Sequence, residues 1–179
     1  MKYSLEQALE ILVNTPTVLR AIFAGLSDPW ICNTYGDKTF SPFDVVGHLI
    51  HGEKTDWMTR AKIILQHGES RPFDPYDRYA QYQAGKGKTI AQLLDEFEAL
   101  RRSNIETLRG LKLSEPDLDR RGTHQALGTV TMRQLLATWV THDLNHVAQI
   151  CKAMAFQYRE EVGAWLRYVS ILKPPSPAD

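Results

Sequence analysis

Two histidines in one stretch of the sequence have the spacing of metal ligands. His142 and His146 lie four residues apart in a segment whose apolar residues recur with helical periodicity. On an α-helix, side chains four residues apart lie on one face, one turn above each other. The two imidazoles can therefore reach one point, and we interpret them as two ligands of a metal ion. A lone histidine on such a face would more often belong to the core.

A third ligand is expected from another helix, which begins at Ser41 and Pro42. The candidates are His48 and His51, three residues apart. We prefer His48, because Gly52 lies one turn further along and would leave space for a metal and its bound water. Three histidines with one open position are typical of a reactive metal centre rather than a purely structural one.

Three polar side chains are candidates for orienting these histidines. Glu53 and Asp143 share helical stripes with apolar residues, and a carboxylate buried without a partner is costly. One or both could accept the second N–H of a histidine and fix its tautomer. A structural hydrogen bond to a tyrosine or an arginine is the alternative. Gln149, three residues after His146, either reaches the site or is an ordinary polar residue on the flank of the helix.

The other motifs favour a mononuclear site. The stretch His142-Asp-x-x-His146 is one methylene short of the His-Glu-x-x-His motif of zinc proteases and lacks their downstream third ligand. Neither the Glu-x-x-His pairs of di-iron bundles nor a glycine-rich phosphate loop occurs. Imidazole suits zinc, nickel, iron or copper, and ligand type alone does not choose among them. We expect His67 and His124 to be solvated and outside the site.

The composition fits one globular domain that binds neither nucleic acid nor membranes. The chain has 179 residues, and its 21 basic and 21 acidic residues cancel. A nucleic-acid-binding domain is usually basic, and no Lys/Arg cluster here exceeds a few residues. No apolar run suits a signal peptide or a membrane-spanning helix, so we expect a cytoplasmic protein. Cys32 and Cys151 are expected to be free thiols.

Helical periodicity dominates the chain, and capping residues divide it into segments. The expected long helices span residues 5–26 (kinked at Thr15-Pro16), 42–66, 90–110 and 132–156. The expected shorter elements are a last helix at 160–171, a helix at 76–82 within the connection 69–88, and a turn at 114–117 within the irregular segment 111–130. Residues 27–40 are expected to form a loop.

These elements predict an all-α fold. No stretch alternates with period two for long enough to build a sheet. We predict a four-helix bundle with an additional C-terminal helix and short helices in the connections. One domain should span residues 1–172, and the proline-rich tail at 173–179 should be disordered.

Two motifs resemble those of the DinB-like family of bacterial four-helix-bundle proteins, also called YfiT-like metal-dependent hydrolases. They are Ser41-Pro-Phe-Asp-Val-Val-Gly-His48-Leu and His142-Asp-Leu-Asn-His146-Val-Ala-Gln149-Ile150, and the resemblance covers nearly the whole chain in helix order. It implies a bundle of the DinB/YfiT type with a divalent metal, often nickel or zinc. By resemblance the ligands are His48, His142 and His146. Related members are thiol-dependent transferases or isomerases, and many are homodimers.

Two classes of function are consistent with these features. The first is a metal-dependent enzyme acting on a small molecule, with transfer of a low-molecular-weight thiol to an electrophile as the leading hypothesis. A metal in such a site lowers the pKa of a bound thiol. Hydrolysis is the close variant, since it needs the same three ligands and open position. The second class is a non-catalytic bundle, in which the metal joins the second and fourth long helices.

Overall fold

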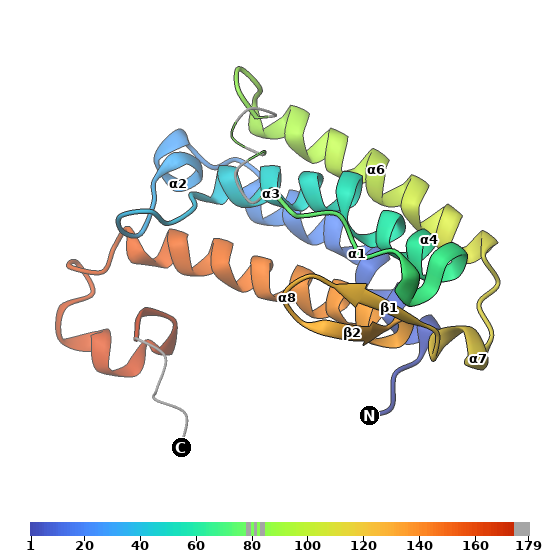
Figure 1. Cartoon of the computed structure of the whole chain (residues 1–179). Helices are drawn as coiled ribbons and strands as arrows, with labels where there is room; N and C mark the ends of the chain where they lie inside the picture. Colours follow the sequence, from blue (N-terminus) through green and yellow to red (C-terminus); the bar gives the residue numbers. More distant parts are fainter. Residues whose placement is uncertain (78–79, 81, 83–84, 174–179) are drawn as a thin grey trace.

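The fold is a bundle of four long helices that lie alongside one another (Figure 1). The computed structural model describes residues 1–77, 80, 82 and 85–173. The long helices are α1 (Leu5–Phe23), α3 (Pro42–Thr55), α6 (Ile90–Gly110) and α8 (Met132–Phe156). Around the bundle their order is α1, α6, α3, α8, so α1 and α3 lie diagonally opposite. This arrangement packs α3 against α8, the two helices that carry the candidate metal ligands.

All four long helices begin at capping residues that the sequence predicts, α1 at Ser4 and the other three with a complete capping box. Ser41, Thr89 and Thr131 each accept a hydrogen bond from the backbone N–H three residues further on. The side chain at that third position bonds back to the capping residue's N–H, which completes a capping box. The predicted starts of α3, α6 and α8 are therefore confirmed.

Helix α1 is continuous through Thr15 and Pro16, where the sequence predicts that a second segment restarts. The Thr15 hydroxyl does not cap a second segment but donates to the carbonyl of Ile11 at 3.0 Å. Pro16 lies inside the helix, which ends at Phe23 rather than Leu26. Proline has no N–H, so the carbonyl of Leu12, four residues earlier, has no helical partner at that position.

The predicted helix at 42–66 is interrupted at Asp56. Helix α3 ends before this residue and α4 (Trp57–His67) begins after it, with Asp56 at φ −102° and ψ −79°. At the break the indole of Trp57 lies against Gly52, where a Cβ would be 3.3 Å from the Trp57 Nε1 atom. The space above Gly52, which we expected to accommodate a metal and its water, is thus filled by Trp57.

The connection before α8 contains a β-hairpin that the sequence does not predict. After α7 (Glu115–Leu118), at the expected turn, β1 (Arg121–His124) pairs antiparallel with β2 (Gly128–Thr131). Strands of four residues are too short to give a clear alternation of apolar and polar residues. Gly122 allows β1 to pack on α4, because a Cβ there would lie 2.7 Å from the side chain of Ile64.

The remaining short elements also differ from the expectations. Helix α2 (Asp28–Cys32) lies within the expected loop at 27–40, and η1 (Gly68–Ser70) follows α4. The C-terminal helix takes the form of two 3₁₀ segments, η2 (Gly163–Tyr168) and η3 (Ser170–Leu172).

Two predicted features include residues that the structure does not describe. Residues 78, 79 and 81 of the expected helix at 76–82 lie outside the described part of the chain, as do residues 174–179 of the expected disordered tail. No described helix is both long and apolar enough to cross a membrane. Cys32 and Cys151 are free cysteines, as predicted.

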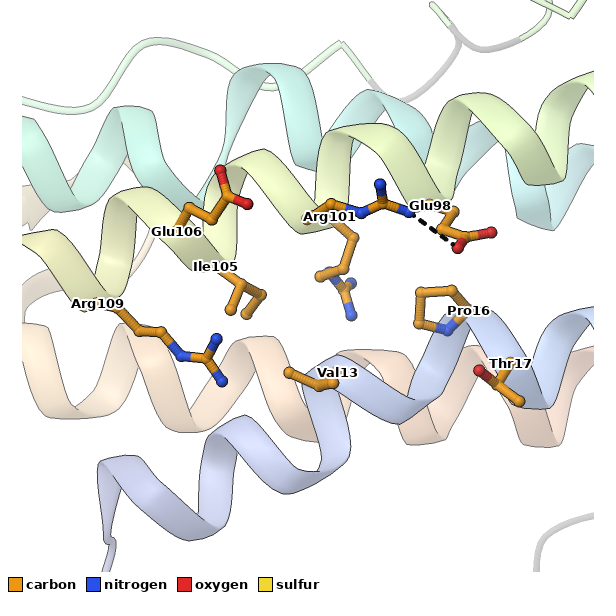
Figure 2. Close-up of a pocket in the computed structure, with 9 residues that line it drawn as sticks. Val13, Pro16, Thr17, Glu98, Arg101, Ile105, Glu106 and Arg109 are labelled. Atoms are coloured by element: carbon orange, nitrogen blue, oxygen red, sulfur yellow. Dashed lines mark hydrogen bonds and ion pairs between the residues drawn. The ribbon is translucent and has the colours of Figure 1, made fainter.

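A polar layer divides the core into two hydrophobic clusters. One contains Leu12, Trp57, Ile105 and Trp139, and the other contains Leu19, Ile50, Phe97 and Ile150. The buried polar residues between them along the helices are Thr15, Glu53, Arg101 and Asp143. In Figure 2 the Arg101 side chain points from α6 into the bundle, towards α1 and near Pro16.

Candidate metal centre

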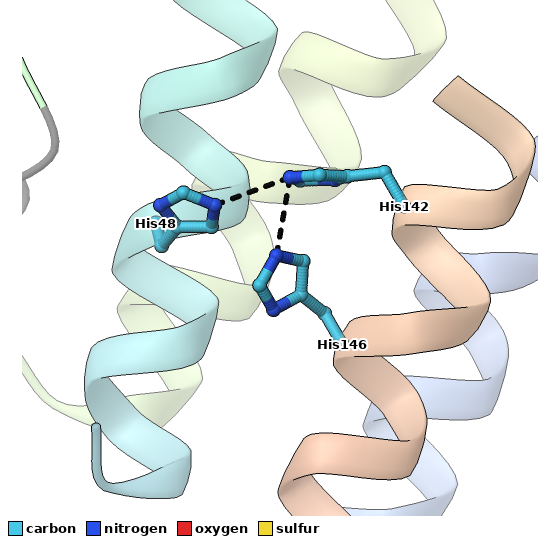
Figure 3. A group of neighbouring side chains, drawn as sticks. All are labelled: His48, His142 and His146. Atoms are coloured by element: carbon cyan, nitrogen blue, oxygen red, sulfur yellow. Dashed lines mark hydrogen bonds between the residues drawn. The ribbon is translucent and has the colours of Figure 1, made fainter. Parts of the chain in front are cut away.

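The structure brings together three histidines from α3 and α8 (Figure 3). The Nε2 atoms of His48 and His146 each lie 3.1 Å from Nε2 of His142. One ring nitrogen from each of the three lies within 4.8 Å of the others. His146 is buried, whereas His48 and His142 are half-buried, so the cluster lies close to the surface of the bundle.

Two of the histidines have a side-chain partner on the ring nitrogen that faces away from the cluster. His146 Nδ1 lies 2.7 Å from Gln149 Oε1, and His48 Nδ1 lies 3.0 Å from the hydroxyl of Tyr76. Because an amide oxygen only accepts, His146 carries its proton on Nδ1 and directs a free lone pair from Nε2 into the cluster. Such outer hydrogen bonds fix the orientation and the tautomer of metal-binding histidines.

His142 differs from the other two in this respect. Its Nδ1 is buried and has no hydrogen-bond partner among the residues that the structure describes. Its ring instead makes an edge contact with the indole of Trp57, with centroids 5.0 Å apart. Packing, rather than a hydrogen bond, therefore holds the outer side of this imidazole.

Burial favours the uncharged forms of His142 and His146. The pKa of His142 is lowered from 6.5 to about 3, chiefly by desolvation and to a smaller extent by the neighbouring His146, His48 and Arg101. Burial also lowers the pKa of His146, against the opposing effect of its hydrogen bond to Gln149. A neutral imidazole is the form that binds a metal, so these rings need not lose a proton to become ligands.

The donor set fits a divalent transition metal. Two nitrogens that each lie about 2.0–2.1 Å from a tetrahedral zinc are roughly 3.3 Å apart. The two Nε2–Nε2 distances of 3.1 Å at His142 are close to that value. Three imidazoles with no carboxylate or thiolate suit zinc or nickel better than calcium or magnesium. The three residues could thus hold one such ion and leave further positions open.

Tyr76 was not anticipated from the sequence, and the hairpin explains how it reaches the site. The N–H of Phe73 donates to the carbonyl of Thr123 in β1 at 2.9 Å, and the Phe73 ring is buried. Gln125 donates to the Phe73 carbonyl at 3.2 Å. These contacts tether the segment that carries Tyr76 alongside α3. No local sequence pattern signals this arrangement, because it depends on the pairing of distant segments.

The carboxylates of Glu53 and Asp143 bind an arginine rather than a histidine. Arg101 donates to Asp143 at 2.6 and 3.0 Å and to Glu53 at 2.8 Å. Glu53 also accepts from the indole of Trp139 at 3.1 Å and from the amide of Asn104 at 3.0 Å. Both acids thus have the arginine partner that the structural alternative expects, and Gln149 is the candidate of the three with a hydrogen bond to a histidine.

The other histidines lie outside the cluster. The His51 ring packs against Tyr76, with centroids 4.8 Å apart, and His67 is exposed at the end of α4. His124 Nδ1 accepts hydrogen bonds from the backbone N–H groups of Ala126 and Leu127, so it closes the hairpin turn rather than being simply solvated. His48, not His51, is the histidine of α3 that faces α8.

Comparison with known proteins supports a family assignment. No curated protein matches the sequence. Among solved structures, YfiT from Bacillus subtilis, described as a probable metal-dependent hydrolase with an unusual four-helix bundle topology, matches with a TM-score of 0.73. The alignment covers 89% of this chain and 91% of that chain at 22% identity, which establishes the shared fold. The sequence model of the DinB superfamily matches residues 11–150, and the chain therefore belongs to the DinB superfamily.

Proposed function

We propose that the protein is a metal-dependent enzyme that binds one divalent ion through His48, His142 and His146 and acts on a small molecule. The observation that carries this proposal is the convergence of the three Nε2 atoms, with both distances from His142 at 3.1 Å. The lowered pKa of His142 and the single tautomer of His146 support it, because both leave lone pairs for a cation.

The residues around the cluster would have different roles in the proposed enzyme. Tyr76 and Gln149 hold His48 and His146 through their outer nitrogens. The rings of Phe40 and Tyr76 flank His48, with centroids 5.9 and 5.7 Å away, and form an apolar surround for a small substrate. When bound, the metal would supply Lewis-acid activation by lowering the pKa of a water molecule or a thiol.

Two reactions fit this site. Hydrolysis is supported by the fold shared with YfiT, which is described as a probable metal-dependent hydrolase. Transfer of a low-molecular-weight thiol, such as bacillithiol, mycothiol or glutathione, is supported by the motif resemblance alone. We propose nickel or zinc as the metal, the cytoplasm as the compartment and a homodimer as the assembly on the same resemblance.

A non-catalytic bundle held together by the metal is the alternative, and one observation speaks against it. Arg101 already joins α3 to α8 through its ion pairs with Glu53 and Asp143. A metal is therefore not needed to connect these helices. The alternative predicts a large loss of folded protein on chelation, whereas the proposed enzyme stays folded without its metal.

Elemental analysis of the purified protein tests the proposal. We expect about one metal ion per chain after incubation with zinc or nickel, and none in the His48→Ala/His142→Ala/His146→Ala variant. His51→Ala is the matched control on α3 and should retain the metal. Absence of metal from the native protein would refute the proposed centre, and full occupancy in a His48→Ala protein would show that the third ligand is wrong. Loaded protein can then be screened with thiols and electrophiles or with hydrolysable esters and amides.

A further inference from the structure

Arg101 of α6 connects all four long helices from a buried position. Its side chain is 2% exposed. One Nη1 hydrogen bond, of 2.8 Å, goes to the carbonyl of Leu12 in α1, which is the carbonyl that Pro16 leaves without a helical partner. The proline inside α1 thus provides an acceptor for Arg101, and Figure 2 shows the two side chains in the same groove between α1 and α6.

The other contacts of Arg101 lie beside the candidate metal ligands. Nη1 and Nη2 both donate to the carboxylate of Asp143, the residue that follows His142 on α8. Nη2 also donates to Glu53, which lies five residues after His48 on α3. One planar guanidinium therefore joins the two ligand-bearing helices close to their ligands, in a geometry that the ammonium group of a lysine cannot reproduce.

A second chain of contacts leads from this cluster to His142. Trp139 donates its Nε1–H to Glu53, and the Arg101 guanidinium lies over the Trp139 ring at 5.2 Å. Trp139 stacks on Trp57, with centroids 5.6 Å apart and planes inclined by 10°. Trp57 in turn makes the edge contact with His142. Both the backbone next to His142 and the ring packed against it are thus held by the Arg101 cluster.

From this geometry we infer that Arg101 is a positioning residue for His142. His48 and His146 each have a side-chain partner on their outer nitrogen, whereas Nδ1 of His142 has none in the described part of the chain. The location of this ring therefore depends on Asp143 and Trp57, and both are held in place through Arg101. The inference rests on the proposed metal centre and adds to it a residue that touches neither the metal site nor its ligands.

Substitution of Arg101 tests the inference through metal affinity. Arg101→Lys is expected to weaken zinc binding about 10-fold or more in a chelator competition, which is the size of effect that outer partners of metal ligands have. It should also change the visible spectrum of the cobalt-substituted protein. Two controls accompany it: Leu93→Ala removes buried volume from the same helix, and Arg102→Lys alters the exposed neighbour. A purely structural role predicts that Arg101→Lys behaves like Leu93→Ala, with reduced stability but an unchanged cobalt spectrum, and that result would overturn the inference.

A charge-free variant keeps the test valid if Arg101→Lys does not fold. In Arg101→Met/Glu53→Leu/Asp143→Leu, the whole ionic cluster is replaced by apolar side chains, an exchange that proteins can tolerate without losing their fold. We expect this folded variant to show the same loss of zinc affinity, because nothing then fixes the backbone beside His142. Native zinc affinity in this variant would overturn the inference.

The imidazole ¹⁵N chemical shifts of the metal-free protein separate this inference from the proposed function. The shifts of His142 should change in Arg101→Lys more than those of His146, whose ring keeps its partner Gln149. If the native protein binds no metal, the proposed function fails, and these shifts still decide whether Arg101 positions His142. Equal or absent shift changes at the two histidines would refute the positioning role.

Discussion

Two polar clusters contain side chains of α3 and α8, the first with Arg101 of α6 in addition, and they differ in how their atoms are satisfied. In the cluster around Arg101, a cation faces two carboxylates, and four of its five N–H groups are used. In the cluster around His142, the Nε2 atoms of His48 and His146 each lie 3.1 Å from Nε2 of His142. The first cluster pairs its charges within the protein and leaves only the Arg101 Nε–H without a partner among the described residues, whereas the second is a set of like donors that suits a cation.

This difference separates a structural cluster from a candidate functional one. Buried opposite charges that bond each other are costly to form and more costly to break, because the remaining partner stays buried without a counter-charge. Removal of one neutral imidazole leaves no buried charge without a counter-charge. Loss of one residue from the Arg101 cluster should therefore destabilise the folded protein. Loss of one histidine should abolish metal binding and leave the fold largely intact.

The largest effect is expected from breaking the Arg101 cluster. Arg101→Met leaves Glu53 and Asp143 buried without their cation, so the free energy of unfolding should fall by about 3–5 kcal/mol. Urea denaturation of the metal-free protein measures this. Arg102→Met is the matched control, because Arg102 is 69% exposed in its ion pair and should change stability by less than about 0.5 kcal/mol. Equal stabilities of the two variants would show that the Arg101 cluster contributes little to the free energy of unfolding.

Metal binding should reveal the histidine cluster in the same kind of experiment. Free zinc at 100 times its Kd should raise the free energy of unfolding of the native protein by about 2.7 kcal/mol, because the folded state alone binds the ion. His142→Ala should lose this gain while its metal-free stability changes little. His67→Ala, on the exposed end of α4, should keep the full gain. A gain that persists in His142→Ala would place the metal elsewhere.

The long helices and the histidine cluster could be predicted because their signals are local. The capping boxes at Ser41, Thr89 and Thr131 each lie within four residues of sequence. The spacing of His142 and His146 follows from the pitch of a single helix. The choice of His48 over His51 placed the correct histidine in the cluster, although the reason we gave, free space above Gly52, does not hold.

The features that were missed depend on contacts between distant segments. Glu53 and Asp143 were recognised as buried acids, but their partner Arg101 lies 48 and 42 residues away on another helix. A signal was available, since Arg101 interrupts the apolar stripe of Phe97 and Ile105 in the sequence. Arg101, Glu53 and Asp143 each lie on an apolar face, so an ion pair between the arginine and the two acids could have been predicted from their opposite charges. Tyr76 had no such signal, because the hairpin that places it comes from a later part of the chain.

The outer hydrogen bonds of the histidines should have a smaller effect than the histidines themselves. Tyr76→Phe removes the hydroxyl 3.0 Å from His48 Nδ1 and should weaken zinc binding about 10-fold. Tyr76 is half-buried, so water can partly replace the hydroxyl, and we expect the lower end of the range for such partners. Zinc competition measures the affinity, with Tyr168→Phe on the exposed C-terminal segment as the control. Unchanged affinity would mean that the Tyr76 hydroxyl does not orient His48.

The smallest effect is expected at the edge of the Arg101 cluster. Asn104 donates to the carbonyl and to Oε2 of Glu53, at 2.8 and 3.0 Å, while Arg101 and Trp139 both bind Oε1. Asn104→Ala should lower the free energy of unfolding by about 1 kcal/mol, because the ion pair stays intact and Asn104 is half-buried.

Asn14→Ala is the matched control for this substitution, since its amide also donates to a backbone carbonyl, that of Glu10, but on the exposed side of α1. It should be neutral or slightly stabilising, because alanine favours the helix. Zinc affinity should not change in either variant if Arg101 alone holds Asp143 beside His142. The contrary result is that Asn104→Ala loses as much zinc affinity as Arg101→Lys. That result would mean that the position of Glu53, rather than the hydrogen bonds from Arg101 to Asp143, determines the geometry of the histidine cluster.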